Sequence, residues 1–94
     1  MRLKNYLTCN QTLYREVNGK VRYYRLVVYL TLFGEYLFVR EYGAVKNKKP
    51  TRTIKEYFPN LLDVQSACEF FMISKLKKGY CSHNFITPVN GIIT

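Results

Sequence analysis

The sequence predicts an α+β fold, in which an antiparallel sheet of four to five strands carries one long helix packed on one face. The first observation behind it is a series of segments between residues 11 and 58 whose apolar and polar residues alternate. The second is the dipeptide Asn18-Gly19, a strong hairpin signal because both residues accept positive φ. The third is a segment from Asp63 to about Lys78 with apolar residues at helical spacing.

The composition indicates one small globular domain. The chain has 94 residues, for which we expect a core over residues 10–86 and peripheral arms over residues 1–9 and 87–94. Hydrophobic residues make up 48% of it, which excludes disorder over most of the length. Nine tyrosines and six phenylalanines, with no tryptophan, favour sheet over a helical bundle because flat rings suit pleated surfaces.

Four segments carry strand patterns, and the first ten residues alternate only weakly, as either a short edge strand or a loose arm. In chain order the predicted strands are Gln11–Val17, Val21–Leu32, Glu35–Tyr42 and Thr51–Phe58. Gly34 turns the chain between the second and the third. The polar loop Lys46–Pro50 follows the third strand, and pairing stops at Pro50 because proline has no N–H to donate.

Alternation also assigns side chains to the two faces of the sheet. On the second strand we expect one face to be buried, with Tyr24, Leu26, Val28 and Leu30. The other face should be half-exposed, with Tyr23, Arg25, Val27, Tyr29 and Thr31. On the third strand Leu37 and Val39 share a face, and the opposite face carries the row Tyr36, Phe38, Arg40 and Tyr42.

That aromatic row (Tyr36, Phe38, Arg40 and Tyr42) has two interpretations. Beside Tyr29 or Arg25 of the neighbouring strand it forms a positively charged surface on which bases and sugars stack. Alternatively it is the inner face of the core, and Arg40 only extends its charged end to solvent.

The helix is the most strongly patterned element. We expect Asp63 to be its N-cap and Leu62 to pack onto Ala67. Its apolar stripe comprises Val64, Ala67, Cys68, Phe71, Met72 and Leu76. The last turn carries Lys75, Lys77 and Lys78, which the helix dipole favours there, and Gly79 suits the position after the helix. The tail, Tyr80–Thr94, is expected to lie across the sheet or the helix.

The segment Thr31–Val45, which reads T-L-F-G-E-Y-L-F-V-R-E-Y-G-A-V, resembles a known family. It is similar to the centre of the WGR domain, a small module of DNA-dependent poly(ADP-ribose) polymerases that also occurs as short bacterial proteins. There T-L-F-G-E-W-x-L-V-R-E-W-G-R-[IV]-G is typical. Thr31–Glu35 and Val39–Glu41 match as they stand, whereas Tyr42-Gly43-Ala44 replaces the signature Trp-Gly-Arg.

The resemblance covers roughly Leu13 to Phe85. The family's helix pattern is followed by Ala67, Phe71, Lys75, Lys77, Lys78, Gly79 and Tyr80, and Ser82-His83-Asn84-Phe85 is similar to a later S-K-N-F segment. The resemblance implies the same sheet-and-helix fold and binding to DNA. It also implies that Tyr42 supplies the flat ring that lies against a sugar at a DNA end. Ala44 cannot do the work of the signature arginine, and Lys46 replaces the following glycine.

Charge supports a polyanion as partner. Fifteen Lys and Arg against six Asp and Glu give a net charge of +9, which draws in nucleic acid first, with DNA favoured over RNA. The predicted nucleic-acid-binding residues are Tyr42, Arg40, Lys46, Lys48, Lys49, Arg52, Lys77 and Lys78. The alternative is a protein-interaction or homo-oligomer module that pairs sheet edges or buries the aromatic row against a partner. A membrane surface and a small-molecule substrate are not expected.

We expect no catalysis, no cofactor and no metal. The sequence has no P-loop, no G-x-S-x-G and no H-E-x-x-H. Cys9, Cys68, Cys81 and His83 match a Cys₃His zinc site in number, but their spacing fits no known knuckle. An odd cysteine count without C-x-x-C indicates reduced thiols and a cytoplasmic protein. No stretch approaches the ~20 apolar residues of a membrane span, and no signal peptide is evident.

Overall fold

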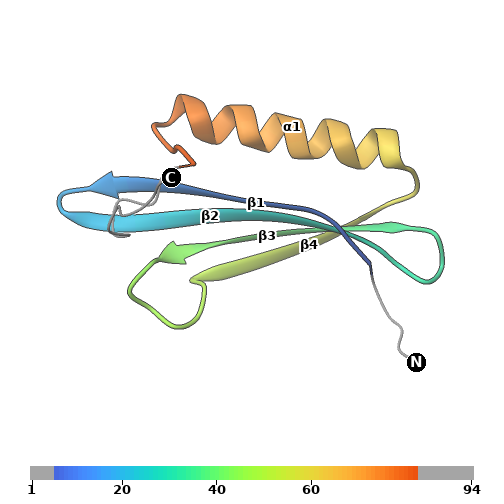
Figure 1. Cartoon of the computed structure of the whole chain (residues 1–94), viewed down its shortest axis with the longest axis horizontal. Coiled ribbons are helices and arrows are strands. Elements are labelled where there is room, and N and C mark those ends of the chain that lie inside the picture. Colours follow the sequence, from blue (N-terminus) through green and yellow to red (C-terminus); the bar gives the residue numbers. More distant parts are fainter. Residues whose placement is uncertain (1–5, 83–94) are drawn as a thin grey trace, which may run out of the picture.

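The computed structural model describes residues 6–82, with side chains from residue 9 onward. Four strands form one antiparallel sheet whose spatial order is the chain order: β1 (Tyr6–Val17), β2 (Lys20–Leu30), β3 (Tyr36–Ala44) and β4 (Arg52–Phe58). A single helix, α1 (Leu61–Lys77), crosses one face of this sheet (Figure 1). The predicted α+β fold is therefore confirmed, with four strands over the described residues.

The β1–β2 hairpin turns at the predicted dipeptide. Asn18 has φ 52° and Gly19 has φ 78°, the two positive values that a two-residue turn of this type requires. The turn fixes the register, so Val17 pairs with Lys20 and Arg15 pairs with Arg22. β1 begins at Tyr6, with a register shift between Leu7 and Cys9. Residues 6–9 consequently belong to the sheet and not to a peripheral arm.

The main core lies between the sheet and α1. Its buried residues are Tyr24, Leu26, Val28, Phe38 and Val64. This confirms the predicted burial of Tyr24, Leu26 and Val28 on the second strand, whereas Leu30, at the end of the strand, is only half-buried. α1 makes its contacts with β2, β3 and β4 on this face.

The opposite face of the sheet holds a second, smaller cluster. Val27 is 1% exposed, and Leu37 and Val39 are each 7% exposed, with Tyr29 packed against them. The predictions that Val27 and Thr31 are half-exposed are therefore wrong, since both side chains are buried. The physical reason is cross-strand pairing: Val27 faces Val39, and the long side chains of Tyr29 and Lys55 flank the pair.

The helix begins three residues earlier than the sequence suggested. Asn60, and not Asp63, is the N-cap: its Oδ1 accepts the Asp63 backbone N–H at 2.8 Å. Its Nδ2 also donates to the Asp63 carboxylate at 3.2 Å. Leu62 therefore lies in the first turn and is 72% exposed, which rules out the predicted packing onto Ala67.

The apolar stripe of α1 is confirmed except at its end. The side chains turned to the sheet are Val64, Ala67, Cys68, Phe71 and Met72. Leu76 is 47% exposed, so its assignment to the stripe was wrong. Its place is taken by Lys75, whose Nζ lies 4.4 Å from the centre of the Tyr24 ring. Helical spacing explains why Lys75 faces the sheet in place of Leu76: it follows Phe71 by four residues and Met72 by three, and residues at these spacings share one face of a helix.

After α1 the chain turns back to the sheet. Gly79 has φ 100°, and its N–H donates to Leu76, while the Tyr80 N–H donates to Lys75. This is the glycine-terminated helix end that the sequence predicted. Cys81 then exchanges two backbone hydrogen bonds with Tyr14 of β1, at 2.6 and 2.8 Å. The predicted packing of the tail is thus seen for Tyr80 and Cys81, and residues 83–94 lie outside the described part. No helix within residues 6–82 is long and apolar enough to cross a membrane.

Candidate functional site

The aromatic row of β3 lies beneath α1. Phe38 is 0% exposed, and its ring contacts those of Phe58 and Phe71 at 6.2 and 5.9 Å between centroids. Tyr29 and Arg25, which the sequence placed beside this row, lie on the opposite face of the sheet, with Tyr29 in the smaller cluster. The interpretation as an open stacking surface is therefore wrong, and the row is the inner face of the core.

Arg40 sits within that core-facing row. The central carbon of its guanidinium lies 4.0 Å from the centre of the Phe71 ring and 5.9 Å from that of Phe38. A guanidinium over a ring face is attracted by the ring quadrupole, so Arg40 is held by the helix and does not simply extend to solvent. Its Nε is buried and has no hydrogen-bond partner among the described residues.

Three tyrosine rings gather at the end of the sheet where α1 finishes. Tyr42 stacks on Tyr24 with centroids 5.6 Å apart and planes at 11°. Tyr80 meets Tyr24 edge-on, with centroids 6.2 Å apart and planes at 67°. Tyr24 is 2% exposed, whereas Tyr42 and Tyr80 are half-buried. These rings form a packed aromatic floor, and their edges reach the surface at this end of the molecule.

Six basic side chains surround this floor, and we refer to them as the cationic cluster: Arg15, Arg22, Arg40, Arg52, Lys75 and Lys78. Register places the strand members, since Arg15 faces Arg22 and Arg52 faces Tyr42. Arg15 also lies over the Tyr80 ring, at 6.0 Å from its centre. All the strand members share the helix-covered face, because residues paired across antiparallel strands point the same way.

The electrostatics of the cluster are one-sided. Burial lowers the pKa of the Lys75 ammonium, and the charges of Lys78 and Arg40 lower it further. Over residues 6–82 the sole ion pair joins Arg25 and Glu41, at 3.7 Å, on the other face of the sheet. The cationic cluster therefore has no carboxylate partner in the described part of the chain, and an anion entering it would relieve the mutual repulsion.

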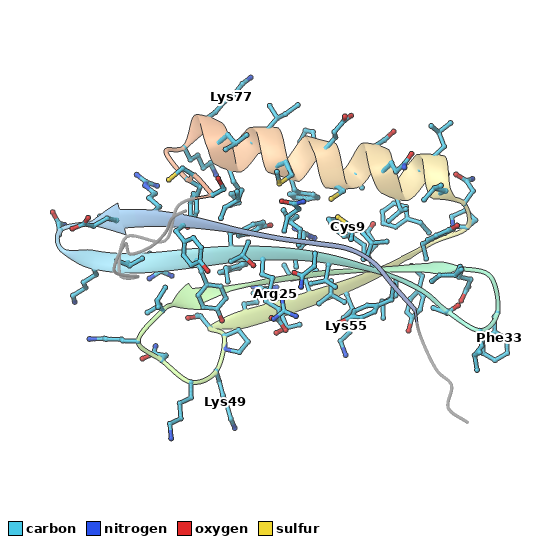
Figure 2. The ribbon with its side chains drawn as sticks, in the orientation of Figure 1. Cys9, Arg25, Phe33, Lys49, Lys55 and Lys77 are labelled. Carbon is cyan, nitrogen blue, oxygen red and sulfur yellow. The ribbon has the colours of Figure 1, made fainter. Side chains whose placement is uncertain are left out.

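The predicted nucleic-acid-binding residues do not form one groove. Tyr42, Arg40, Arg52 and Lys78 belong to or border the cationic cluster. The loop between β3 and β4 holds Lys46, Lys48 and Lys49, all exposed. Lys49 extends away from the helix side of the molecule, and Lys77 points from α1 away from the sheet (Figure 2). Lys48 borders a pocket on the opposite face with Tyr23 and Glu41. The sheet lies between the cationic cluster and the pocket that Lys48 borders, and Lys77 lies on the outer side of α1.

Three members of the cluster were not predicted as site residues. Arg15 and Arg22 are brought together by the two-residue turn, because a turn at Asn18-Gly19 makes them direct cross-strand partners. That signal was present in the sequence. Lys75 could have been found from helical spacing, which continues the stripe from Phe71 to position 75.

No three His, Cys, Asp or Glu side chains come together to hold a metal ion within the described part. Cys81 pairs with Tyr14, whereas Cys9 pairs with Val28 further along the sheet. His83 of the proposed Cys₃His set lies outside the described residues.

The segment that resembles the WGR domain forms the β2–β3 turn and β3. Gly43 of the altered signature is packed tightly: a Cβ built there would lie 2.8 Å from the Thr51 backbone nitrogen. Ala44, in place of the signature arginine, faces Arg22 across the strands. Comparisons with protein families, curated proteins and solved structures find no match to this chain. The resemblance stays a prediction.

Proposed function

We propose that this protein is a non-catalytic nucleic-acid-binding module in which the cationic cluster holds backbone phosphates. The observation that carries the proposal is the gathering of six basic side chains around one aromatic floor, without a carboxylate partner among the described residues. Phosphates are the anions that such sets of Arg and Lys prefer. The resemblance to the WGR domain favours DNA over RNA, and a cytoplasmic location belongs to the same proposal because no disulfide framework is expected.

The binding mode rests on phosphate contacts and not on an open stacking platform. Tyr42 has one ring face against Tyr24, so its part is to position the neighbouring Arg52. The β1–β2 turn, the β3–β4 loop and the C-terminal end of α1 all lie at the same end of the sheet (Figure 1). The loop lysines Lys46, Lys48 and Lys49 therefore add long-range attraction at the end that carries the cluster.

A salt series tests the proposal. Binding of a short labelled DNA duplex is measured by fluorescence anisotropy at increasing KCl, for the unaltered chain and for the double variant Arg15→Gln/Arg22→Gln. Each phosphate contact contributes about 0.9 to the slope of log K against log salt, so the variant should lose about two units of slope. At intermediate salt its Kd should rise by about tenfold or more. Nicked duplex and single-stranded RNA show whether ends or strand type matter.

The matched control removes the same charge from the other face. Arg25→Gln/Lys55→Gln has the same net charge as the cluster variant, but both residues lie on the face opposite α1. Its slope should stay within about half a unit of the unaltered chain. Equal losses in both variants would mean that net charge alone drives binding, and absence of binding at low salt would reject the proposal outright.

The alternative function, self-association through a sheet edge, has one observation in its favour. β4 is an edge strand with mostly exposed side chains, and its helix-side residues are Arg52, Ile54, Glu56 and Phe58. Two copies paired antiparallel about Ile54 would place each Arg52 opposite Glu56 of the other copy. Opposite charges at directly facing positions stabilise a strand pair, so this edge is complementary to a second copy of itself.

Sedimentation velocity across a concentration series tests this alternative. Glu56→Arg would set like charges opposite each other and abolish a β4 dimer, and the charge exchange Arg52→Glu/Glu56→Arg would restore it. The nucleic-acid proposal expects the reverse response to Glu56→Arg, namely unchanged mass and tighter DNA binding. A single monomeric species at all concentrations would reject the dimer.

A further inference from the structure

A groove runs between α1 and the β1–β2 side of the sheet, with a volume of about 880 Å³. Its walls include Cys9, Val28 and Tyr36 from the sheet and Val64, Cys68 and Met72 from the helix. Cys9 points from β1 towards α1 (Figure 2). Cys9 and Cys68 thus line the same groove from opposite sides and pack against the same core cluster.

Both thiols are reduced and half-buried, and they come from elements far apart in the sequence. Neither belongs to the cationic cluster, and no part of the proposed function uses them. Two cysteines that line one groove from an edge strand and a helix are placed to form an intrachain disulfide, provided that their Cβ atoms can approach to about 4 Å.

We propose that Cys9 and Cys68 form an oxidisable thiol pair, which a small-molecule disulfide such as oxidised glutathione converts to an intrachain disulfide. One cysteine thiolate attacks a sulfur of the oxidant, releasing one thiol and leaving a mixed disulfide on the protein. The second cysteine then attacks the protein sulfur of that bond and releases the second thiol. The protein loses two protons and two electrons, and the oxidant is reduced to two thiols.

The surroundings set the rate of this exchange. Burial first, and then the neighbouring Cys9 thiol and the Glu69 carboxylate, raise the pKa of the Cys68 thiol to about 11. Few Cys68 thiolates exist at neutral pH, so exchange is slow there and accelerates as the pH rises towards that pKa. Once formed, the bond ties the edge strand β1 to α1 and closes one side of the groove.

The bond should also stabilise the fold. Cross-linking two residues so distant in the chain restricts the unfolded ensemble. The stabilisation typical of such a disulfide should raise the thermal midpoint of a small domain by about 10 °C or more. Cys81 provides the internal comparison: it lies beside Tyr14 and outside the groove.

The test exposes the full, folded chain to oxidised glutathione at pH 7 and pH 9, then maps disulfides by peptide mass spectrometry without reduction. We expect a Cys9–Cys68 peptide link, a faster reaction at pH 9 and a higher thermal midpoint. Cys81→Ser should form the same link at the same rate. Cys9→Ser should stop at a glutathione adduct or not react, with no rise in the midpoint.

Two results would overturn the proposal. One is a folded protein that accumulates stable glutathione adducts on Cys9 or Cys68 without linking them. The other is a link that forms only in denaturant, or that joins Cys81 as often as Cys68. Because no variant alters the cationic cluster, these outcomes are independent of DNA binding.

Discussion

Tyr42 stacks on Tyr24 with ring centroids 5.6 Å apart and planes only 11° from parallel. Tyr24 is in turn covered by Lys75 and met edge-on by Tyr80. The Tyr42 ring is therefore part of the packing between the sheet and α1. Its contribution to function is indirect, because it supports the surface on which the cationic cluster is arranged.

Replacing Tyr42 with alanine should consequently be a stability change first. Loss of a half-buried ring and of one stacked pair should lower the free energy of unfolding by about 2–3 kcal/mol. Tyr42→Phe keeps the ring and should stay within about 0.5 kcal/mol of the unaltered chain. Equilibrium urea unfolding measures both. A stable Tyr42→Ala variant that selectively loses DNA ends would instead show that the ring contacts the nucleic acid.

The sequence was sufficient for the fold because its signals are local. Asn18-Gly19 fixed the first hairpin and its register, and Gly79 ended the helix as expected. The alternation of residues correctly predicted which side chains of β3 share a face of the sheet. On β3 taken alone it could not say which of the two faces the helix would cover, since both carry apolar side chains: Phe38 on one and Leu37 and Val39 on the other.

The site was harder to predict because it depends on that choice of face. Basic residues that are neighbours in sequence, such as Lys77 and Lys78 or the loop lysines, were assumed to act together. The cationic cluster instead joins residues from all four strands and the helix, and only strand register unites them. Arg15 and Arg22 could have been paired from the hairpin, and Lys78 follows Lys75 by one helical turn, whereas the approach of Arg40 to Lys75 needs the docking of α1.

The N-cap assignment gives a direct test of the helix boundary. Asn60→Ala removes the side-chain oxygen that accepts the Asp63 N–H, and it should cost about 0.5–2 kcal/mol. Asp63→Ala leaves the Asp63 N–H in place and removes a charge from the first turn, which should cost about 0.3–1 kcal/mol. Urea unfolding of both variants measures the two losses. A larger loss for Asp63→Ala than for Asn60→Ala would return the cap to the residue that the sequence suggested.

Gly43 should not tolerate a side chain. A Cβ there would lie 2.8 Å from the Thr51 nitrogen and 3.1 Å from its hydroxyl, both within the β3–β4 connection. Gly43→Ala should therefore cost about 1–3 kcal/mol by overpacking. Gly34→Ala is the comparison: it meets no atom within 4 Å but has φ 84°, so its cost of about 1–2 kcal/mol comes from backbone strain alone.

Backbone NMR shifts separate the two glycine variants, because only Gly43→Ala should perturb the start of β4. Chemical-shift changes confined to residue 43 and its chain neighbours, with no loss of stability, would contradict the close packing.

Lys75→Met separates folding from binding. Burial and the charges of Lys78 and Arg40 lower the pKa of Lys75 below the usual 10.5, so the unfolded chain holds this proton more tightly than the folded one. The charged lysine thus opposes folding at every pH below its folded pKa, and stability rises with pH between that value and 10.5. Methionine removes this cost and keeps an apolar stem over Tyr24, but it gives up a cation–π contact of about 0.5–1 kcal/mol.

The two effects oppose each other, so the unfolding free energy of Lys75→Met should stay within about 1 kcal/mol of the value for the unaltered chain. The variant should also lack the rise in stability that the unaltered chain shows between the lowered pKa of Lys75 and pH 10.5. DNA binding should weaken, with the salt slope reduced by about one unit, because one cation has left the cationic cluster. Lys77→Met removes an equal charge from a side chain that points away from the sheet, and it should alter the slope less. If Lys75→Met destabilised the chain by more than that margin while binding DNA normally, Lys75 would serve the fold, and the cluster would lose the member that links the helix to the strands.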